Sequence, residues 1–372
     1  MLAPGIFRLR ACGYRLQPLW WRSAPHALCV DSLKVGDAPI QNGKETCMAG
    51  RLKLREITIE PGEKKKAYMA VTQTPGGQPL GFPLMVVNGT KEGPILLVNG
   101  AVHGDEYESG EAIRAIWRDL DPKALSGVFV GVPVVNVPAF EAGRRSNPID
   151  GINMNRIFPG KLDGFLSEQL AYYFYHEILE KCDMVVDMHG GGVALAISPT
   201  VIYREMGSDE LQAKAKELAY ATGVDLVWRG GGKWGGAINV EGMRAGKPTI
   251  TVELGGEGRC LDKFVDAQRK AIENVMKYYK MIPGVPDLPK ERIIAPGSFD
   301  FSTKGGLLRT KKQLRDLVKK GEVIATISDL FGDVVEEIKA PHDGIIVSQR
   351  TFPTIHAGEW TVFVGTYSVE KA

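Results

Sequence analysis

His103 and Glu106 form an H-x-x-E pattern at the end of an apolar run, in the stretch VNGAVHGDEYESGEA (98–112). A zinc hydrolase needs about three protein ligands and leaves one coordination position open for water. The H-x-x-E spacing can direct both side chains at one ion, but it also occurs by chance at the polar end of a buried strand. Both interpretations stay open from this stretch alone, and a third ligand has to decide between them.

His189 is the best candidate for that third ligand. It ends the apolar run MVVDMH and precedes three glycines. In α/β sheets, functional side chains gather beyond the carboxyl ends of the strands, so two histidines at two strand ends could share one ion. The alternative is a histidine that ends a strand and hydrogen-bonds to backbone. The remaining histidines fit less well, because they lie in the N-terminal segment, inside a helix or in the C-terminal region: His26, His176, His342 and His356.

Glu253 ends a further apolar run, in PTITVELGGEGR. Burying a carboxylate is costly unless it has a partner or a task. A metal ion lowers the pKa of bound water to near 7, and a carboxylate beside it suits the role of general base. The alternative is an ion pair with an arginine in the core.

Alternating strand-like and helix-like segments would position these residues. Residues 52–74 alternate apolar and polar side chains, which is typical of antiparallel strands at a sheet edge. After them, apolar runs of strand length take turns with segments of helical period. This alternation predicts an α/β fold, with a mixed central sheet and helices on both faces. The expected strands cover 94–102, 127–136, 183–192, 224–228 and 248–256, and the expected helices 113–120, 165–182, 208–222 and 261–281.

Three prolines in MIPGVPDLPKE (281–291) predict a linker, after which the period of the pattern changes to two. Residues 291–372 are therefore expected to form a small C-terminal all-β barrel-sandwich module. Parts of it are similar to lipoyl-like domains, but no lysine stands at the turn that carries their cofactor, so we expect a structural cap. The expected catalytic domain is 48–282. Residues 1–47 are expected to be a poorly ordered extension, with an arginine-rich transit peptide as the alternative.

The composition excludes several classes of protein. The chain has 372 residues, of which 44% are apolar and 24% charged, as in ordinary soluble domains. A net charge of +2 gives no reason to expect nucleic acid or a membrane surface as a partner. No apolar run reaches the ~18 residues of a membrane span. The five cysteines include no C-x-x-C pair, so we expect neither a zinc–thiolate site nor a disulfide framework, and a cytoplasmic location.

GGGKWG (230–235) matches the G-x-G-x-x-G pattern of dinucleotide-binding folds and follows the apolar run VDLVW. Such a fold requires a helix to begin there. The following GAINVEGMRAGKP contains glycines and a proline without a helical face, so we expect a mobile active-site loop instead. This loop could bring Lys233 or Trp234 to a substrate, with Arg244 as a further candidate.

Four motifs in order, NGAVHGDE, NVPAFEAGRRSNPIDGINMNRIFPG, DMHGG and ELGG, resemble the succinylglutamate desuccinylase/aspartoacylase family, a branch of the zinc carboxypeptidase superfamily. The resemblance covers about residues 85 to 370 and is greatest to members of the N-acetyl-diaminobutyrate deacetylase type. It implies that His103, Glu106 and His189 hold one Zn²⁺ per chain and that Glu253 is the base.

The resemblance also assigns roles to the polar loop between the two histidine motifs. Asn155 and Arg156, in NMNR, would bind the α-carboxylate of the substrate, the arginine through two parallel hydrogen bonds. An arginine of GRRSNPID would polarise the scissile carbonyl and stabilise its oxyanion. We expect Arg145 in that role, with Arg144 as a substrate-binding neighbour and as the alternative in register. A solvated basic turn is the alternative for the whole loop.

The function that these implications favour is a zinc-dependent amidohydrolase that removes an acetyl or succinyl type of group from a small amino acid. The alternatives are a zinc carboxypeptidase acting on peptides and a non-catalytic binding protein on the same scaffold. A C-terminal module placed as a lid over the mouth of the site would exclude long peptides. A binding protein is expected to have lost a ligand or the base, and all four positions are filled. The expected partner is a small N-acyl amino acid, with a homo-oligomer as a further expectation.

Overall fold

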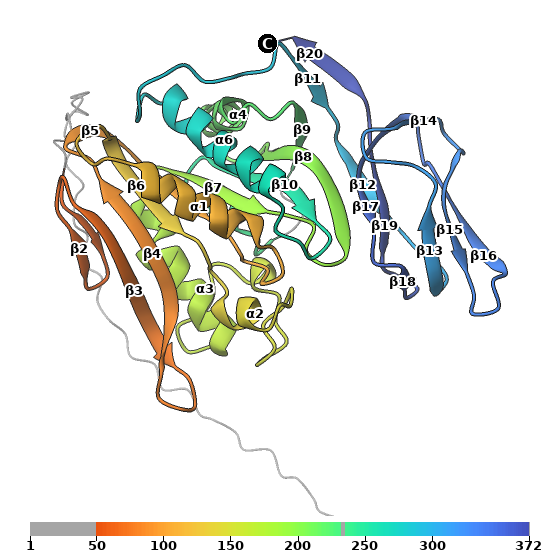
Figure 1. The fold of residues 1–372 in the computed structure, drawn as a ribbon, viewed down its shortest axis with the longest axis horizontal. Helices are drawn as coiled ribbons and strands as arrows, with labels where there is room; N and C mark the ends of the chain where they lie inside the picture. Colours follow the sequence, from red (N-terminus) through yellow and green to blue (C-terminus); the bar gives the residue numbers. More distant parts are fainter. Residues whose placement is uncertain (1–49, 232–234, 372) are drawn as a thin grey trace, which may run out of the picture. The chain divides into compact units, whose positions relative to one another are not determined.

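The computed structural model describes residues 50–231 and 235–371, so the predicted extension 1–47 and the candidates Lys233 and Trp234 lie outside it. Within these residues, a large mixed sheet forms the centre of the fold (Figure 1). Its strands follow the order β12–β19–β17–β8–β10–β7–β5–β6–β4–β3, and β9, β11, β14 and β20 join it off this path. A two-stranded sheet β1–β2 and a four-stranded sheet β16–β15–β13–β18 complete the strands.

The bounds of the strands up to β10 are β1 (Leu52–Leu54), β2 (Ile57–Ile59), β3 (Lys64–Gln73), β4 (Pro79–Asn88), β5 (Lys91–Asn99), β6 (Ser126–Val132), β7 (Met184–His189), β8 (Leu195–Arg204), β9 (Leu226–Gly230) and β10 (Thr249–Gly256). The later strands are β11 (Glu291–Ile294), β12 (Gly297–Phe301), β13 (Gly306–Thr310), β14 (Leu317–Val318), β15 (Val323–Ser328), β16 (Val334–Lys339), β17 (Gly344–Arg350), β18 (Thr354–Ile355), β19 (Trp360–Gly365) and β20 (Ser368–Lys371).

The α-helices are α1 (Glu108–Asp119), α2 (Val137–Glu141), α3 (Leu166–Glu177), α4 (Asp209–Ala221), α5 (Ile238–Arg244) and α6 (Asp262–Tyr278). Two 3₁₀ turns accompany them, η1 (Met154–Arg156) and η2 (Leu179–Lys181). Among the described residues, none of these helices combines the length and the apolar character needed to cross a membrane.

Helices cover both faces of the large sheet (Figure 1). Along β5, Leu96 and Val98 belong to an apolar cluster shared with α1, α4 and α6, whereas Leu97 belongs to a second cluster shared with α3. Successive side chains of a strand point to opposite faces, so the two clusters lie on opposite sides of the sheet. In the second cluster, the ring of Phe174 in α3 meets Phe82 of β4 edge to face, with centroids 5.9 Å apart. The predicted mixed α/β sheet with helices on both faces is confirmed.

β8 is a ten-residue strand in a region for which the sequence predicted no strand. It pairs antiparallel with β10 and β17 and parallel with β9, so three neighbours satisfy its backbone. Strand formation depends on such neighbours, which are distant in the sequence. Through β17, where Ser348 lies opposite Ile197, the C-terminal strands continue the large sheet. The four-stranded sheet packs on β17 and β19 through an apolar cluster that includes Ile324 and Ile346.

The prediction of a mobile loop after β9 is wrong for residues 238–244, which form α5. The N–H of Ile238 donates to the side-chain oxygen of Asn155 at 2.9 Å and so satisfies a free donor at the start of the helix. Gly242 lets the helix lie against β10, because a Cβ there would come within 2.2 Å of the hydroxyl oxygen of Thr249. Packing against the sheet therefore overrides the weak helical propensity of this segment.

Candidate active site

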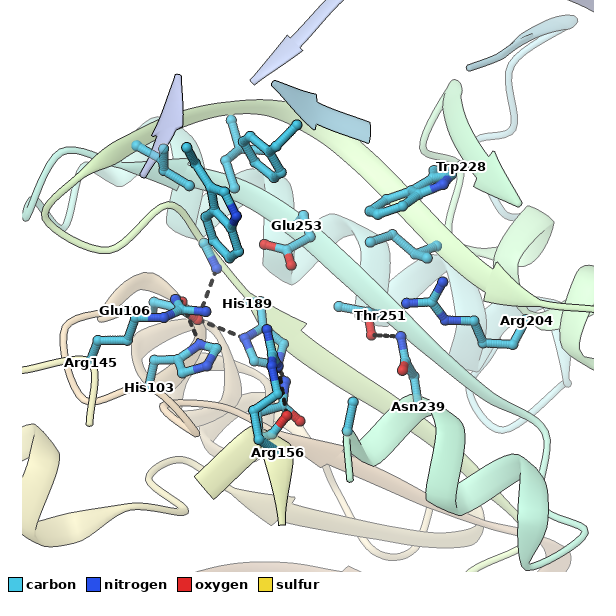
Figure 2. A pocket seen from close by; sticks show the side chains of 18 residues that line it. His103, Glu106, Arg145, Arg156, His189, Arg204, Trp228, Asn239, Thr251 and Glu253 are labelled. Carbon is cyan, nitrogen blue, oxygen red and sulfur yellow. Dashed lines mark hydrogen bonds and ion pairs between the residues drawn. The ribbon is translucent and has the colours of Figure 1, made fainter. Parts of the chain in front are cut away.

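The carboxyl ends of parallel strands bring the predicted site residues together. β5 pairs in parallel with β7, and β7 pairs in parallel with β10, where His189 lies directly opposite Glu253. His189 is the last residue of β7, and His103 and Glu106 follow β5 at the same edge of the sheet. Figure 2 shows His103, Glu106 and His189 grouped on one side of Glu253. Residues from three parts of the sequence are therefore neighbours at this edge.

Glu106 lies between the two histidines. Its Oε1 is 2.7 Å from Nδ1 of His103, and its Oε2 is 2.8 Å from Nδ1 of His189. One ligand atom from each of the three buried side chains lies within 4.8 Å of the other two. Among the described residues, no other group of three or more His, Cys, Asp or Glu side chains is close enough to hold a metal ion. Two imidazole nitrogens and a carboxylate oxygen form a ligand set typical of catalytic zinc.

Asp187 supports His189 from the second ring nitrogen. Its Oδ2 is 3.0 Å from Nε2 of His189, and the side chain of Asn99 donates to its Oδ1 at 2.7 Å. Such a carboxylate fixes the tautomer and orientation of a metal-binding histidine and makes it a better ligand. The sequence analysis did not select Asp187. The pattern DMH could have identified Asp187, because residues two apart on a strand point to the same face and Asp187 therefore lies beside His189.

The protonation states of His103 and Glu106 suit metal ligands, whereas Asp187 and Glu106 raise the pKa of His189, whose proton a metal ion would have to displace. Burial lowers the pKa of His103 to about 4, and the nearby charge of Arg145 acts in the same direction. The ring of His103 is therefore neutral near pH 7, which is the form that binds metal. Burial alone would raise the pKa of Glu106, but His103 and His189 together hold it well below its usual range. Glu106 is thus an ionised carboxylate.

Glu253 faces the cavity beside this cluster (Figure 2). Within residues 50–231 and 235–371, its side chain makes no hydrogen bond or ion pair, so the alternative of a core ion pair does not hold there. Burial raises its pKa to about 8, although the charge of His189 opposes this shift. A carboxylate with a raised pKa and no partner can accept and return a proton. Its position at the cavity wall is therefore compatible with the predicted role of base.

Arg145 reaches the cluster, whereas Arg144 does not. The Nη1 of Arg145 donates to Oε1 of Glu106 at 3.3 Å, and its guanidinium lies 5.7 Å from the ring centre of Trp360. Arg144 is exposed and does not line the cavity. The geometry therefore favours Arg145 over Arg144 as the arginine that faces the cavity, a choice that the sequence left open.

Asn155 and Arg156 lie in η1, next to His189. The Nδ2 of Asn155 is 3.4 Å from Nε2 of His189, and its Oδ1 accepts the hydrogen bond from Ile238 in α5. The side chain of Asn155 thus bonds to the start of α5 and lies next to the cluster. Arg156 lines the cavity, with its Nη1 donating to the backbone carbonyl of Asn155 at 2.7 Å. Arg244, the other candidate of this region, pairs with Glu241 and does not line the cavity.

The cavity beside the cluster has a volume of about 140 Å³. Its lining includes one arginine and three aromatic residues that were not selected from the sequence: Arg204, Trp228, Phe299 and Trp360. Phe299 of β12 and Trp360 of β19 stack with their centroids 4.7 Å apart. The C-terminal strands therefore supply part of the cavity wall. Aromatic residues in strands carry no functional signal by themselves, since most of them pack in cores.

Known proteins are similar to this chain in sequence and in fold. The sequence profile of the succinylglutamate desuccinylase/aspartoacylase catalytic domain matches residues 92–279. The N-alpha-acetyl-L-2,4-diaminobutyric acid deacetylase of Halomonas elongata is 33% identical over 294 residues, which make up 75% of this chain and 83% of that protein. The chain belongs to the succinylglutamate desuccinylase/aspartoacylase family. The resemblance inferred from the four motifs is thereby confirmed.

Two solved structures have the same fold as this chain. The product-bound ectoine utilization protein EutE (DoeB) from Ruegeria pomeroyi has a TM-score of 0.79 and 27% identity, covering 86% of this chain and 99% of that chain. A succinylglutamate desuccinylase/aspartoacylase from Rhodobacter sphaeroides has a TM-score of 0.76 and 26% identity, covering 83% of this chain and 98% of that chain. The common fold thus extends over nearly the full length of these relatives.

Proposed function

We propose that the chain is a zinc-dependent hydrolase that removes an N-acyl group, of the acetyl or succinyl type, from a small amino acid. The observation that carries this proposal is the buried cluster of His103, Glu106 and His189 next to Glu253, a carboxylate without a partner in the described residues. The names of the relatives support the reaction class, because they describe a deacetylase and a desuccinylase. From these relatives we adopt the reaction class and not the side chain of the substrate.

The cluster fits one zinc ion per chain. His103 and His189 would bind it through Nδ1 and Glu106 through its carboxylate, and Asp187 would hold His189 in the required orientation. A bound zinc ion would lower the pKa of water and polarise the acyl carbonyl. This assignment rests on the ligand types and the burial of His103, Glu106 and His189, and on the carboxylate of Asp187 behind His189.

Glu253 is the proposed base. It removes a proton from the water molecule that attacks the acyl carbonyl carbon, and it later gives that proton to the nitrogen of the leaving amine. Water adds across the C–N bond, so the products are a free carboxylic acid and an amino acid. Arg145 lies on the Glu106 side of the cavity, where its guanidinium can stabilise the negative charge that develops on the carbonyl oxygen.

Arg156 is the proposed site for the α-carboxylate. Its guanidinium lines the cavity beside His189, and arginine pairs with carboxylates through two parallel hydrogen bonds. The proposed role of Asn155 is indirect, because its amide oxygen already accepts the hydrogen bond from Ile238. Arg144, which is exposed, has no part in this proposal.

A small substrate is favoured over a peptide. The cavity of about 140 Å³ is smaller than the roughly 300–1,000 Å³ of sites for drug-sized ligands. Phe299 and Trp360, from the C-terminal strands, form part of its wall. A carboxypeptidase needs room for a chain that continues beyond the scissile bond, and these aromatic rings reduce that room.

The test is an assay of the zinc-loaded protein against N-acetyl, N-succinyl and N-formyl amino acids, combined with metal analysis. We expect hydrolysis of at least one compound, loss of activity on chelation and recovery with zinc. His103→Ala and His189→Ala should each lose most of the bound metal, whereas His176→Ala, at a histidine outside the cavity, should retain it. Full metal content in both ligand variants would remove the cluster from the proposal.

A further inference from the structure

The turn between β15 and β16, residues 329–333, presents two large apolar side chains to solvent. Leu330 is 90% exposed and Phe331 is 94% exposed. Hydrogen bonds close the turn, because the N–H groups of Phe331 and Asp333 donate to Oδ1 of Asp329 at 2.9 and 3.0 Å. The N–H of Asp329 donates in return to the carbonyl of Asp333 at 2.9 Å. This turn, called the tip below, therefore holds both apolar side chains outward.

β16 continues the apolar surface of the tip along an open sheet edge. Val334 and Val335, the first residues of β16, are exposed as well. Within residues 50–231 and 235–371, β16 pairs with β15 and with no other strand, and Figure 1 shows it at the outer margin of the C-terminal strands. The free side of such a strand offers backbone donors and acceptors to another chain. Contiguous exposed apolar surface is typical of a protein–protein contact.

Contacts on its inner side hold β16 in place. The carboxylate of Glu336 accepts hydrogen bonds from the N–H groups of Thr303 and Lys304 at 3.0 and 2.9 Å. Ile338 is buried in the apolar cluster of the C-terminal strands. A second strand would therefore meet an edge that is already formed, and little conformational entropy would be lost on pairing.

The two ends of β16 carry opposite charge. At its start, the tip contributes the carboxylates of Asp329 and Asp333. At its end lie three exposed lysines: Lys319, Lys320 and Lys339. The turn that carries the first two lies beside the end of the strand, because the N–H of Gly321 donates to the carbonyl of Ala340 at 2.8 Å. In the described parts of the chain Lys320 makes no ion pair, so its charge is available to a partner.

We propose that the tip and β16 form a contact between two copies of this chain, related by a twofold axis. Antiparallel pairing of β16 with its copy sets the acidic tip of each chain against the basic end of the other, and Leu330 and Phe331 leave water. A half-turn thus makes this surface complementary to itself, which selects a second copy as the partner. None of the described residues that line the cavity belongs to the tip or to β16, so this proposal does not rest on the proposed function.

Sedimentation velocity of the full chain, from roughly 1 to 100 μM, measures the association. One strand and one turn make a contact at the small end of specific interfaces, so we expect a dimer whose fraction increases with concentration. Replacing both apolar side chains, Leu330→Ser with Phe331→Ser, should raise the dissociation constant by roughly tenfold or more. Phe165→Ser is the matched control, at a phenylalanine 72% exposed just before α3. A monomeric wild type, or a double variant that associates normally, overturns the proposal.

Charge reversal at the two ends tests the antiparallel arrangement. In Asp333→Lys, and separately in Lys320→Glu, like charges meet at both ends of the contact, so each variant alone should associate at least several-fold more weakly than the wild type. An equimolar mixture should regain the association, because every end contact again joins opposite charges. Both side chains are exposed, and thermal melting of each variant verifies folding. A mixture that associates no better than its components overturns the reciprocal contact.

Hydrogen exchange identifies the strand that pairs. Main-chain pairing should slow the exchange of amides in 334–339 at high protein concentration relative to low concentration, and the double variant of Leu330 and Phe331 should lose this difference. The exposed turn before α4, residues 205–208, is the internal control and should exchange equally at both concentrations. A dimer that leaves exchange in 334–339 unchanged uses another surface, and this result would overturn the proposal.

Discussion

Glu253 and His189 lie directly opposite each other on the neighbouring parallel strands β10 and β7. Residues opposed in a parallel pair face the same side of the sheet, so this register sets the proposed base beside a proposed metal ligand. Gly192, three residues after His189, and Gly255, two residues after Glu253, adopt positive φ angles of +55° and +85°, a conformation that favours glycine.

Replacement of Glu253 by glutamine should separate catalysis from metal binding. The amide keeps the shape of the side chain but cannot accept the proton, so turnover should fall by ~10² or more while zinc content stays normal. Steady-state rates and metal analysis measure the two effects. Glu205→Gln, at an exposed glutamate of the surface after β8, is the control. A Glu253→Gln enzyme of nearly normal rate excludes Glu253 from the mechanism.

The pH dependence of kcat/KM should have an acid limb that depends on Glu253. Burial raises the pKa of Glu253 to about 8, and a cation bound at the cluster would lower it from there. A base works only when deprotonated, so activity should be lost as the pH falls through this pKa, at a midpoint below about 8. A pH–rate profile of the zinc enzyme measures the midpoint. A rate that increases toward lower pH contradicts the assignment.

Asp187→Asn should weaken zinc binding without removing a ligand. The carboxylate of Asp187 contacts the second ring nitrogen of His189 at 3.0 Å, and loss of such a partner typically costs 10- to 100-fold in metal affinity or activity. Competition with a chelator of known affinity gives the change. Asp183→Asn, an exposed aspartate just before β7, is the control and should bind zinc normally. Equal affinity of Asp187→Asn and wild type would falsify the supporting role.

The two neighbouring arginines should differ strongly. Arg145 contacts Glu106 and lines the cavity, so Arg145→Gln should lower kcat by roughly 10² as a lost oxyanion donor. Arg144→Gln should leave kcat within a few-fold of wild type, because Arg144 is exposed. The comparison uses one substrate and the same zinc loading. Similar losses in both variants point to a general effect of loop charge.

Substrates that lack the α-carboxylate should react slowly. Replacing this carboxylate by an amide removes the proposed partner of Arg156, and kcat/KM should fall by roughly 10² or more. Arg156→Lys should be impaired as well, since a point charge does not reproduce two parallel hydrogen bonds. An acylated tripeptide should be poor because Phe299 and Trp360 restrict the cavity. Similar rates for the amino acid, its amide and the tripeptide favour a broad peptidase or amidase.

The sequence by itself determined the residues whose signal is local. His103, His189 and Glu253 each stand at the end of an apolar run of strand length, and Glu106 follows His103 by three residues. The length and composition of such a run indicate a buried strand and where it ends. Strand ends in a parallel sheet meet at one edge, so these four positions could be expected to gather before any contact was known. The alternation of strands and helices likewise gave the mixed α/β sheet.

Only the tertiary structure decided which other residues meet them. β8 forms a strand because it pairs with β9, β10 and β17, and this strand places Arg204 in the wall of the cavity. α5 forms because Asn155 and β10 hold it, although its own sequence favours a loop. Arg145 differs from Arg144 because it contacts Glu106 and Trp360, which come from other parts of the chain. These contacts join positions far apart in the sequence, and no local pattern encodes them.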